Sequence, residues 1–135
     1  MIVVDTSAVV AIVRQEDEAT AFINILDDSA AAVMSAVSFV EAHMVLVGRR
    51  LRAGPGPIES TMKALGIEIA DVTYDQAMLA VHGFSAYGKG RHRAKLNIAD
   101  CFAYALAKSR GAPLLFKGDD FSETDVVPAW RPNTK

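Results

Sequence analysis

The sequence is poor in the features that mark secreted, membrane-spanning and disulfide-stabilised proteins. It has one cysteine, Cys101, among 135 residues, which excludes a disulfide framework and a zinc site built on several cysteines. No apolar run reaches the ~18–20 residues that a membrane-spanning helix needs, and no basic segment precedes an apolar one at the start. We therefore expect a cytoplasmic protein without a membrane partner.

The sequence also lacks a strong excess of charge. Its 14 Lys and Arg residues stand against 16 Asp and Glu residues, a formal net charge of −2, which argues weakly against a whole-surface nucleic-acid binder. Hydrophobic residues make up 51% of the chain, enough to bury a core and to exclude disorder. We expect one domain over residues 1–130 and a flexible tail over 131–135.

Short apolar runs alternate with segments of helical spacing along the chain. This alternation predicts an α/β fold, in which a mostly parallel sheet of four to five strands is covered by helices on both faces. We expect Ser7 and Thr73 to cap two of the helices. The functional site of such folds lies at the carboxyl ends of the strands. The expected strands cover residues 2–4, 32–34, 67–72, 114–116 and 126–127.

Acidic residues stand at or near the positions that this rule singles out. Asp5 follows the first strand, where it serves equally well as a helix cap. Glu41 and Asp100 interrupt apolar helices, although Glu41 also suits an exposed helix edge. A lone Asp is poor for helix propensity and for burial, so function explains Asp100 better than stability does. Asp119 and Asp120 follow the fourth strand, where either also suits a simple turn.

Four carboxylates that meet above one sheet would repel one another strongly. A hard divalent cation relieves this repulsion, and sites rich in carboxylate oxygens suit Mg²⁺ or Mn²⁺. Because Mg²⁺ keeps several waters, coordination room is left for a phosphate group. The acidic residues therefore predict metal-assisted hydrolysis of phosphodiester bonds.

Four short motifs stand along the chain, and they are Asp5-Thr6-Ser7, Glu41, Asn97-x-x-Asp100 and Gly118-Asp119-Asp120-Phe121. With these motifs the sequence resembles a known family, the PIN domain, and in particular its short bacterial form, the VapC-type toxin ribonucleases. The resemblance covers essentially the whole chain and depends on the order and spacing of several short motifs. It implies a PIN-like three-layer α/β/α sandwich.

The resemblance also implies an activity and its partners. It implies an endoribonuclease that depends on Mg²⁺ or Mn²⁺, inhibits translation and growth, and is itself inhibited by a cognate VapB-type antitoxin. Family members of this type commonly form homodimers and larger complexes with the antitoxin. The family's first three acids match Asp5, Glu41 and Asp100, and its fourth matches Asp119, with Asp120 left open.

The resemblance assigns roles within this group. Asp5 and Asp100 match the main metal ligands, while Glu41 and Asp119 complete the acidic shell. Supporting polar side chains match at Thr6, Ser7 and Asn97.

Basic residues gather in two short segments. The first is a glycine-flanked loop that leads into the expected helix of Asp100, and we expect it to contact RNA phosphates. The second follows the helix of Glu41 and suits either RNA or acidic antitoxin residues. A solvated loop is the alternative for both segments. The first contains Lys89, Arg91, Arg93 and Lys95, and the second Arg49, Arg50 and Arg52.

Two other classes of protein compete with the ribonuclease interpretation. A phospho-acceptor receiver domain also places acids at strand ends and a lysine after a late strand, as Lys117 is placed. Such a domain needs a pair of acids after its first strand, however, and only Asp5 stands there. A non-catalytic interaction module of the same fold would not need all four acidic positions.

Overall fold

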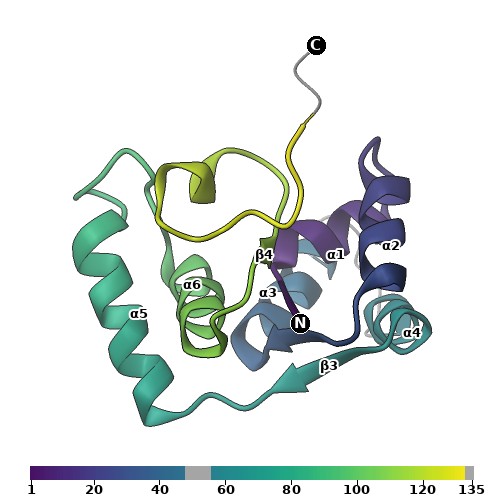
Figure 1. Cartoon of the computed structure of the whole chain (residues 1–135), viewed down its shortest axis with the longest axis horizontal. Helices are drawn as coiled ribbons and strands as arrows, with labels where there is room; N and C mark the ends of the chain where they lie inside the picture. Colours follow the sequence, from purple (N-terminus) through teal and green to yellow (C-terminus); the bar gives the residue numbers. More distant parts are fainter. Residues whose placement is uncertain (48–55, 133–135) are drawn as a thin grey trace.

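A computed structural model describes residues 1–47 and 56–132 (Figure 1). Within these ranges, helices surround a central sheet, as expected. None of the helices in them combines the length and the apolar character needed to cross a membrane. In chain order the elements are β1 (Ile2–Val4), α1 (Thr6–Val13), α2 (Ala19–Asp28), β2 (Ala32–Ser35), α3 (Ala36–Val47), α4 (Gly56–Leu65), β3 (Ile67–Ala70), α5 (Tyr74–Tyr87), α6 (Ile98–Arg110), β4 (Leu114–Leu115) and the 3₁₀ helix η1 (Asp120–Glu123).

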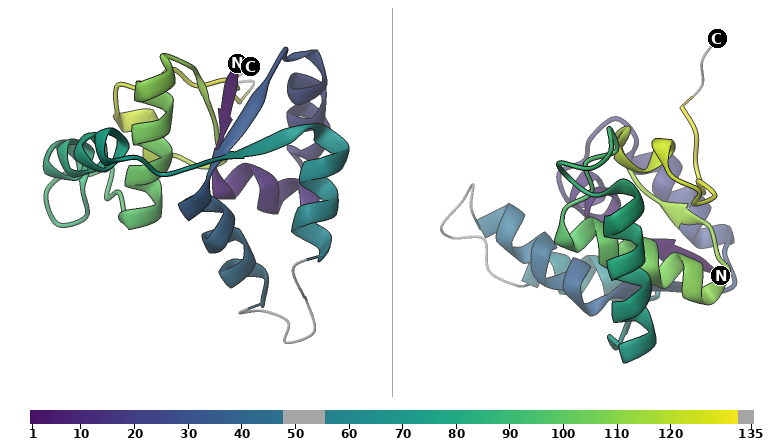
Figure 2. Two further views of the ribbon diagram at one scale, coloured as in Figure 1. Left: turned by 90° about the horizontal axis from the view of Figure 1, so that it is seen from below. Right: turned by 90° about the vertical axis from the view of Figure 1, so that its left-hand side faces the viewer.

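The sheet has the strand order β3-β2-β1-β4, and every neighbouring pair of strands is parallel. Helices α5 and α6 cover one face, and α1, α2 and α4 lie on the other (Figure 2). This arrangement confirms the three-layer α/β/α sandwich. Because all the strands run in the same direction, their carboxyl ends meet at one edge of the sheet.

The fifth strand expected at 126–127 is wrong. Leu114 instead forms an isolated bridge with Pro128, in which the Leu114 amide donates to the Val127 carbonyl and the Ala129 amide donates to the Leu114 carbonyl. The pairing is limited to this one bridge, so residues 126–127 do not form a strand.

The central strands are apolar on both sides because each side faces its own core. In β1, Val3 packs with the α5–α6 layer and Val4 packs with the α1–α2 layer. Leu114 and Leu115 divide in the same way in β4. Cys101 belongs to the α5–α6 core and is a buried free thiol, consistent with its interpretation as a small core residue.

Candidate active site

A pocket of about 290 Å³ opens at the carboxyl ends of the strands. Four acidic side chains line it, and they come from four separate parts of the chain. Asp5 follows β1, Glu41 lies on α3, Asp100 lies on α6, and Asp120 begins η1. The fold therefore brings together three of the four acids expected at the site, and it adds Asp120.

Asp5 is the most buried of these acids, with 4% of its surface exposed. It is the N-cap of α1, where its Oδ2 accepts hydrogen bonds from the Ser7 amide at 3.0 Å and from Ser7 Oγ at 2.7 Å. The expectation that Ser7 caps this helix is wrong, because the chain is still extended at Asp5 and turns helical at Thr6. The other oxygen, Asp5 Oδ1, is buried without a hydrogen-bond partner.

Burial shifts the protonation of Asp5 as well. Desolvation raises the pKa of Asp5 from 3.8 to about 6, although the hydrogen bonds from Ser7 act in the opposite direction. Repulsion from Glu41 adds to the increase. A buried oxygen without a donor, on a carboxylate that is costly to ionise, has the character of a cation ligand.

Two hydroxyl groups after Asp5 tie the pocket together. Ser7 Oγ accepts a hydrogen bond from the Lys117 amide at 3.0 Å and donates one to Asp5 Oδ2. The segment after β4 therefore fixes Ser7, and Ser7 in turn fixes Asp5. Thr6 Oγ1 donates to the Ser38 carbonyl at 3.0 Å, which fixes α1 against α3. Thr6 therefore supports the site through the position of α3, and Ser7 supports Asp5 directly.

Asp100 occupies the third position of α6 and closes a capping box with Asn97. Asn97 Oδ1 accepts from the Asp100 amide at 2.8 Å, and Asp100 Oδ2 accepts from the Asn97 amide at 3.1 Å. An acid is favourable at this position. The expectation that Asp100 is poor for helix propensity is therefore wrong, because α6 begins at Ile98, immediately after its Asn97 N-cap.

The surroundings of Asp100 nevertheless make its negative charge costly. Burial raises the pKa of Asp100 from 3.8 to about 7, against the effect of the hydrogen bond from Asn97. Repulsion from Asp5, Glu41 and Asp120 raises it further. Glu41 itself is half-buried on α3. The four carboxyl groups thus form one electrostatic unit.

Asp120, and not Asp119, is the residue of the adjacent pair that lines the pocket. Asp119 is exposed, and its carbonyl accepts from the Ser122 amide and from Ser122 Oγ. Gly118 adopts a φ of +99°, which turns the chain after β4 in a way that few other residues tolerate. Buried Phe121 then anchors η1 and fixes the direction of Asp120.

The carboxylate oxygens of this pocket fit a hard divalent cation that keeps part of its water shell. In residues 1–47 and 56–132, no three His, Cys, Asp or Glu side chains converge closely enough to enclose an ion by themselves. Mg²⁺ needs only one or two direct carboxylates and holds the rest of its shell as water. The orphaned Asp5 Oδ1 and the mutual repulsion of the acids support such an ion.

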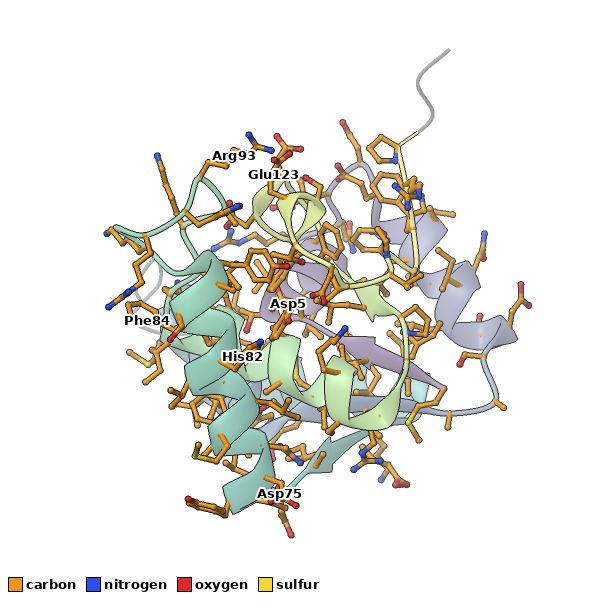
Figure 3. All side chains as sticks on the ribbon, turned by 60° about the vertical axis from the view of Figure 1, so that its left-hand side comes forward. Asp5, Asp75, His82, Phe84, Arg93 and Glu123 are labelled. Atoms are coloured by element: carbon orange, nitrogen blue, oxygen red, sulfur yellow. The ribbon has the colours of Figure 1, made fainter. Side chains whose placement is uncertain are left out.

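The first basic segment forms a closed loop between α5 and α6. Its base is held by hydrogen bonds from the Lys89 amide to the Leu96 carbonyl and from the Leu96 amide to the Tyr87 carbonyl. Arg93 forms an ion pair with Glu123 of η1, at the outer surface above buried Asp5 (Figure 3). The loop is therefore tied to the same short helix that carries Asp120.

The four basic side chains of this loop, Lys89, Arg91, Arg93 and Lys95, belong to exposed residues. The Arg91 guanidinium lies 5.4 Å from the centre of the Phe84 ring, where it keeps most of its donors accessible. The second basic segment, with Arg49, Arg50 and Arg52, lies outside the described residues.

Lys117 lines the pocket, although the sequence did not lead us to assign it to the site. We considered it only for the receiver-domain alternative, yet it lines the pocket beside the four acids. The available signal was its position, because it follows β4 after one intervening residue, Phe116.

The chain matches the model of the PIN domain over residues 2–127. It is 40% identical over 125 residues to the VapC ribonuclease Mb0640 of Mycobacterium bovis, which covers 93% of this chain and 95% of the relative. It is 42% identical over 125 residues to a ribonuclease VapC of Mycolicibacterium smegmatis, at 93% and 97% coverage.

Solved structures of low sequence identity share the fold. VapC20 of Mycobacterium tuberculosis, described as a sarcin-ricin loop cleaving toxin, superposes with a TM-score of 0.73 at 18% identity and covers 98% of this chain and 100% of that chain. A toxin–antitoxin complex from Klebsiella pneumoniae gives a TM-score of 0.71 at 19% identity, with 98% and 100% coverage.

Proposed function

The chain belongs to the VapC ribonucleases of the PIN-domain family, and from that premise we propose that it hydrolyses RNA phosphodiester bonds as the toxin of a toxin–antitoxin pair. The observation that carries this proposal is the single pocket shared by Asp5, Glu41, Asp100 and Asp120. A receiver domain would not gather acids from α3 and α6, so this geometry favours the nuclease.

Asp5 and Asp100 would hold the divalent ion, Mg²⁺ or Mn²⁺, and Glu41 and Asp120 would bind its waters. When bound, such an ion lowers the pKa of a water molecule and neutralises negative charge on the phosphate. Asp5 offers its unpartnered Oδ1 for this purpose. Of the sequence-based assignment, Asp119 is replaced here by Asp120.

The neighbouring residues act by positioning these acids. Ser7 holds Asp5 through two hydrogen bonds, and Asn97 holds Asp100 in the capping box. Thr6 fixes α3, which carries Glu41, through the Ser38 carbonyl. Preorganised ligands of this kind lose little conformational freedom when the ion and the substrate bind.

The RNA strand would approach across the basic loop. Lys89, Arg91, Arg93 and Lys95 lie on the loop that joins η1 through the Arg93–Glu123 ion pair. A phosphate group that replaces Glu123 as the partner of Arg93 would lead the strand toward Asp120. We therefore assign the four basic residues to phosphate contacts, which carry affinity without base specificity.

The partners follow from the same family. We propose that a VapB-type antitoxin inhibits the protein in the cytoplasm, and that the toxin forms a homodimer and larger complexes with its antitoxin. A structural relative from Klebsiella pneumoniae is described as a toxin–antitoxin complex, which supports the pairing.

The decisive test is the substitution Asp100→Asn. The asparagine keeps an oxygen for the capping box but loses the charge, so we expect folded protein whose Mg²⁺-dependent RNA cleavage falls by about 100-fold or more. Cleavage is followed on a labelled RNA, and circular dichroism checks the fold. Full Mg²⁺-dependent activity of this variant would overturn the assignment.

A further inference from the structure

Lys117 stands next to the acidic pocket but does not pair with its acids. Its backbone nitrogen is two hydrogen bonds away from Asp5 Oδ2, through Ser7 Oγ at 3.0 and 2.7 Å. Among the described residues that line the pocket, it is the one with a cationic side chain. Because the lysine side chain is a flexible four-carbon stem, the Lys117 ammonium can reach the carboxylate of Asp5 from this position.

Two glutamates outside the pocket hold the Lys117 ammonium instead. Lys117 Nζ lies 2.8 Å from Glu16 Oε1 and 3.2 Å from Glu18 Oε1. Both glutamates are half-buried in the connection between α1 and α2 and do not line the pocket. Two carboxylates on one ammonium form a small network, which is stronger than an isolated surface ion pair.

The connection between α1 and α2 is shaped for this contact. Gln15 adopts a φ of +55°, in the left-handed region that residues other than glycine seldom occupy. The Glu16 amide then donates to the Ala11 carbonyl at 2.9 Å, which sets the position of Glu16. Glu18 stands at the N-cap of α2 without capping it, so its carboxylate is left for Lys117.

An ammonium group inside the pocket would have a definite effect on a metal ion. The four acids attract any cation, and a lysine of the same chain competes at a very high effective concentration. Ammonium and divalent ion would then exclude each other by repulsion. Contacts that hold the Lys117 ammonium outside the pocket therefore maintain the affinity of the pocket for the metal ion.

We propose that Glu16 and Glu18 are positioning residues that hold Lys117 at the pocket rim and so keep its ammonium out of the divalent-metal site. The proposal rests on the proposed function, because that function supplies the metal. It assigns a role in metal affinity to two residues that touch neither the ion nor the RNA.

The test is a set of Mn²⁺ titrations by isothermal calorimetry at constant pH and ionic strength. The wild type is compared with Glu16→Gln/Glu18→Gln, with Lys117→Met, and with the triple variant that combines all three changes. We expect the double variant to bind Mn²⁺ about five- to tenfold more weakly. Lys117→Met and the triple variant should both bind about as tightly as the wild type.

We call the contact of Glu16 and Glu18 with the Lys117 ammonium the clamp. The triple variant distinguishes an effect of the clamp from the effect of a general loss of negative charge. If the two Glu→Gln changes weaken Mn²⁺ binding equally in the presence of Lys117 and in the Lys117→Met background, bulk electrostatics explains the effect and the clamp is overturned. An unchanged affinity of the double variant overturns it as well. Asp17→Asn is the matched control, since Asp17 lies between the two glutamates and is exposed, and we expect it to change the affinity by less than about twofold.

The same titrations keep this proposal distinct from the proposed function. A wild type that binds no Mn²⁺ overturns both. A wild type that binds Mn²⁺ but cleaves no RNA contradicts the ribonuclease mechanism, while the comparison of double and triple variants still decides on the clamp. Thermal melts of all five proteins check that the differences do not come from loss of the fold.

Discussion

At the residue scale, the carboxyl groups of this pocket differ in what surrounds them. Asp5 is buried and held by Ser7, while Asp100 is less buried and held by Asn97. Both carry a desolvation cost that raises the pKa of each group, to about 6 and about 7. The divalent ion that we propose would offset that cost at both positions at once.

The two neighbouring acids after β4 allow a matched comparison. Both acids are exposed, but Asp120 lines the pocket and raises the pKa of Asp100, whereas Asp119 does not line the pocket. We expect Asp120→Asn to lower Mg²⁺-dependent RNA cleavage by about 10- to 100-fold, and Asp119→Asn to change it little. Initial cleavage rates of the two variants decide the matter. A larger loss in the Asp119 variant would restore Asp119 as the fourth acid.

At the scale of elements, α6 is positioned by its first turn. The capping box of Asn97 and Asp100 satisfies two amides that have no partner within the helix. At the other end, Gly111 takes the left-handed conformation that closes the helix. The acid at the third position therefore serves the helix and the pocket together.

Two helix caps separate stability from activity. Asn97→Ala should lower the free energy of unfolding by about 1 kcal/mol and also reduce RNA cleavage, because Asp100 loses its partner. Thr73→Ala removes the comparable cap of α5, whose hydroxyl accepts from the Gln76 amide. We expect a similar loss of stability, measured by urea denaturation, with cleavage unchanged. Equal loss of activity in both variants would show that stability alone is responsible.

The loop between α5 and α6 carries a prediction about RNA affinity. Arg91→Ala/Arg93→Ala removes two proposed phosphate contacts, so we expect weaker RNA binding and a shallower dependence on salt, by about 0.7 per contact in the logarithmic slope for single strands. Fluorescence anisotropy in Asp100→Asn protein measures binding without cleavage. Lys63→Ala/Arg110→Ala removes the same charge from exposed positions on α4 and α6 and serves as the control. Unchanged affinity of the loop variant at low salt would contradict the assignment.

At the scale of the whole molecule, the raised pKa values connect the site to stability. The folded protein binds protons at Asp5 and Asp100 more tightly than the unfolded chain, whose carboxyl groups titrate near 3.8. Between about pH 4 and 7 the folded state therefore holds more protons, and the free energy of unfolding falls as the pH rises.

This linkage predicts that the metal-free protein melts at a higher temperature at pH 5.5 than at pH 8. Differential scanning calorimetry in EDTA measures the difference, and Asp5→Asn/Asp100→Asn should reduce it because both titrating groups are gone. Added Mg²⁺ should raise the melting temperature mainly at pH 8, where the acids are ionised. The same pH dependence in wild type and double variant would contradict the raised pKa values.

Much of the architecture was predictable because the signals are local. The buried runs at β1 and β4 and the helical spacing between the strands indicated a parallel sheet with helices on both faces, and the structure confirms it. Thr73 caps α5 as predicted. The prediction of a strand at 126–127 was wrong, because the pairing with β4 is limited to one bridge at Pro128. The N-cap of α1 is Asp5 instead of Ser7, a choice that only the hydrogen bonds of the structure could decide.

The sequence by itself determined the fold class, the resemblance to a nuclease family, and the candidates Asp5, Glu41 and Asp100, because periodicity and residue type express these features without any distant contact. Only the tertiary structure decided that Asp120 enters the pocket instead of Asp119, since that choice depends on the turn at Gly118 and the anchoring of η1. It also decided that Lys117 faces Glu16 and Glu18. These residues lie about 100 positions apart in the chain, and only the packing of β4 beside β1 brings them together.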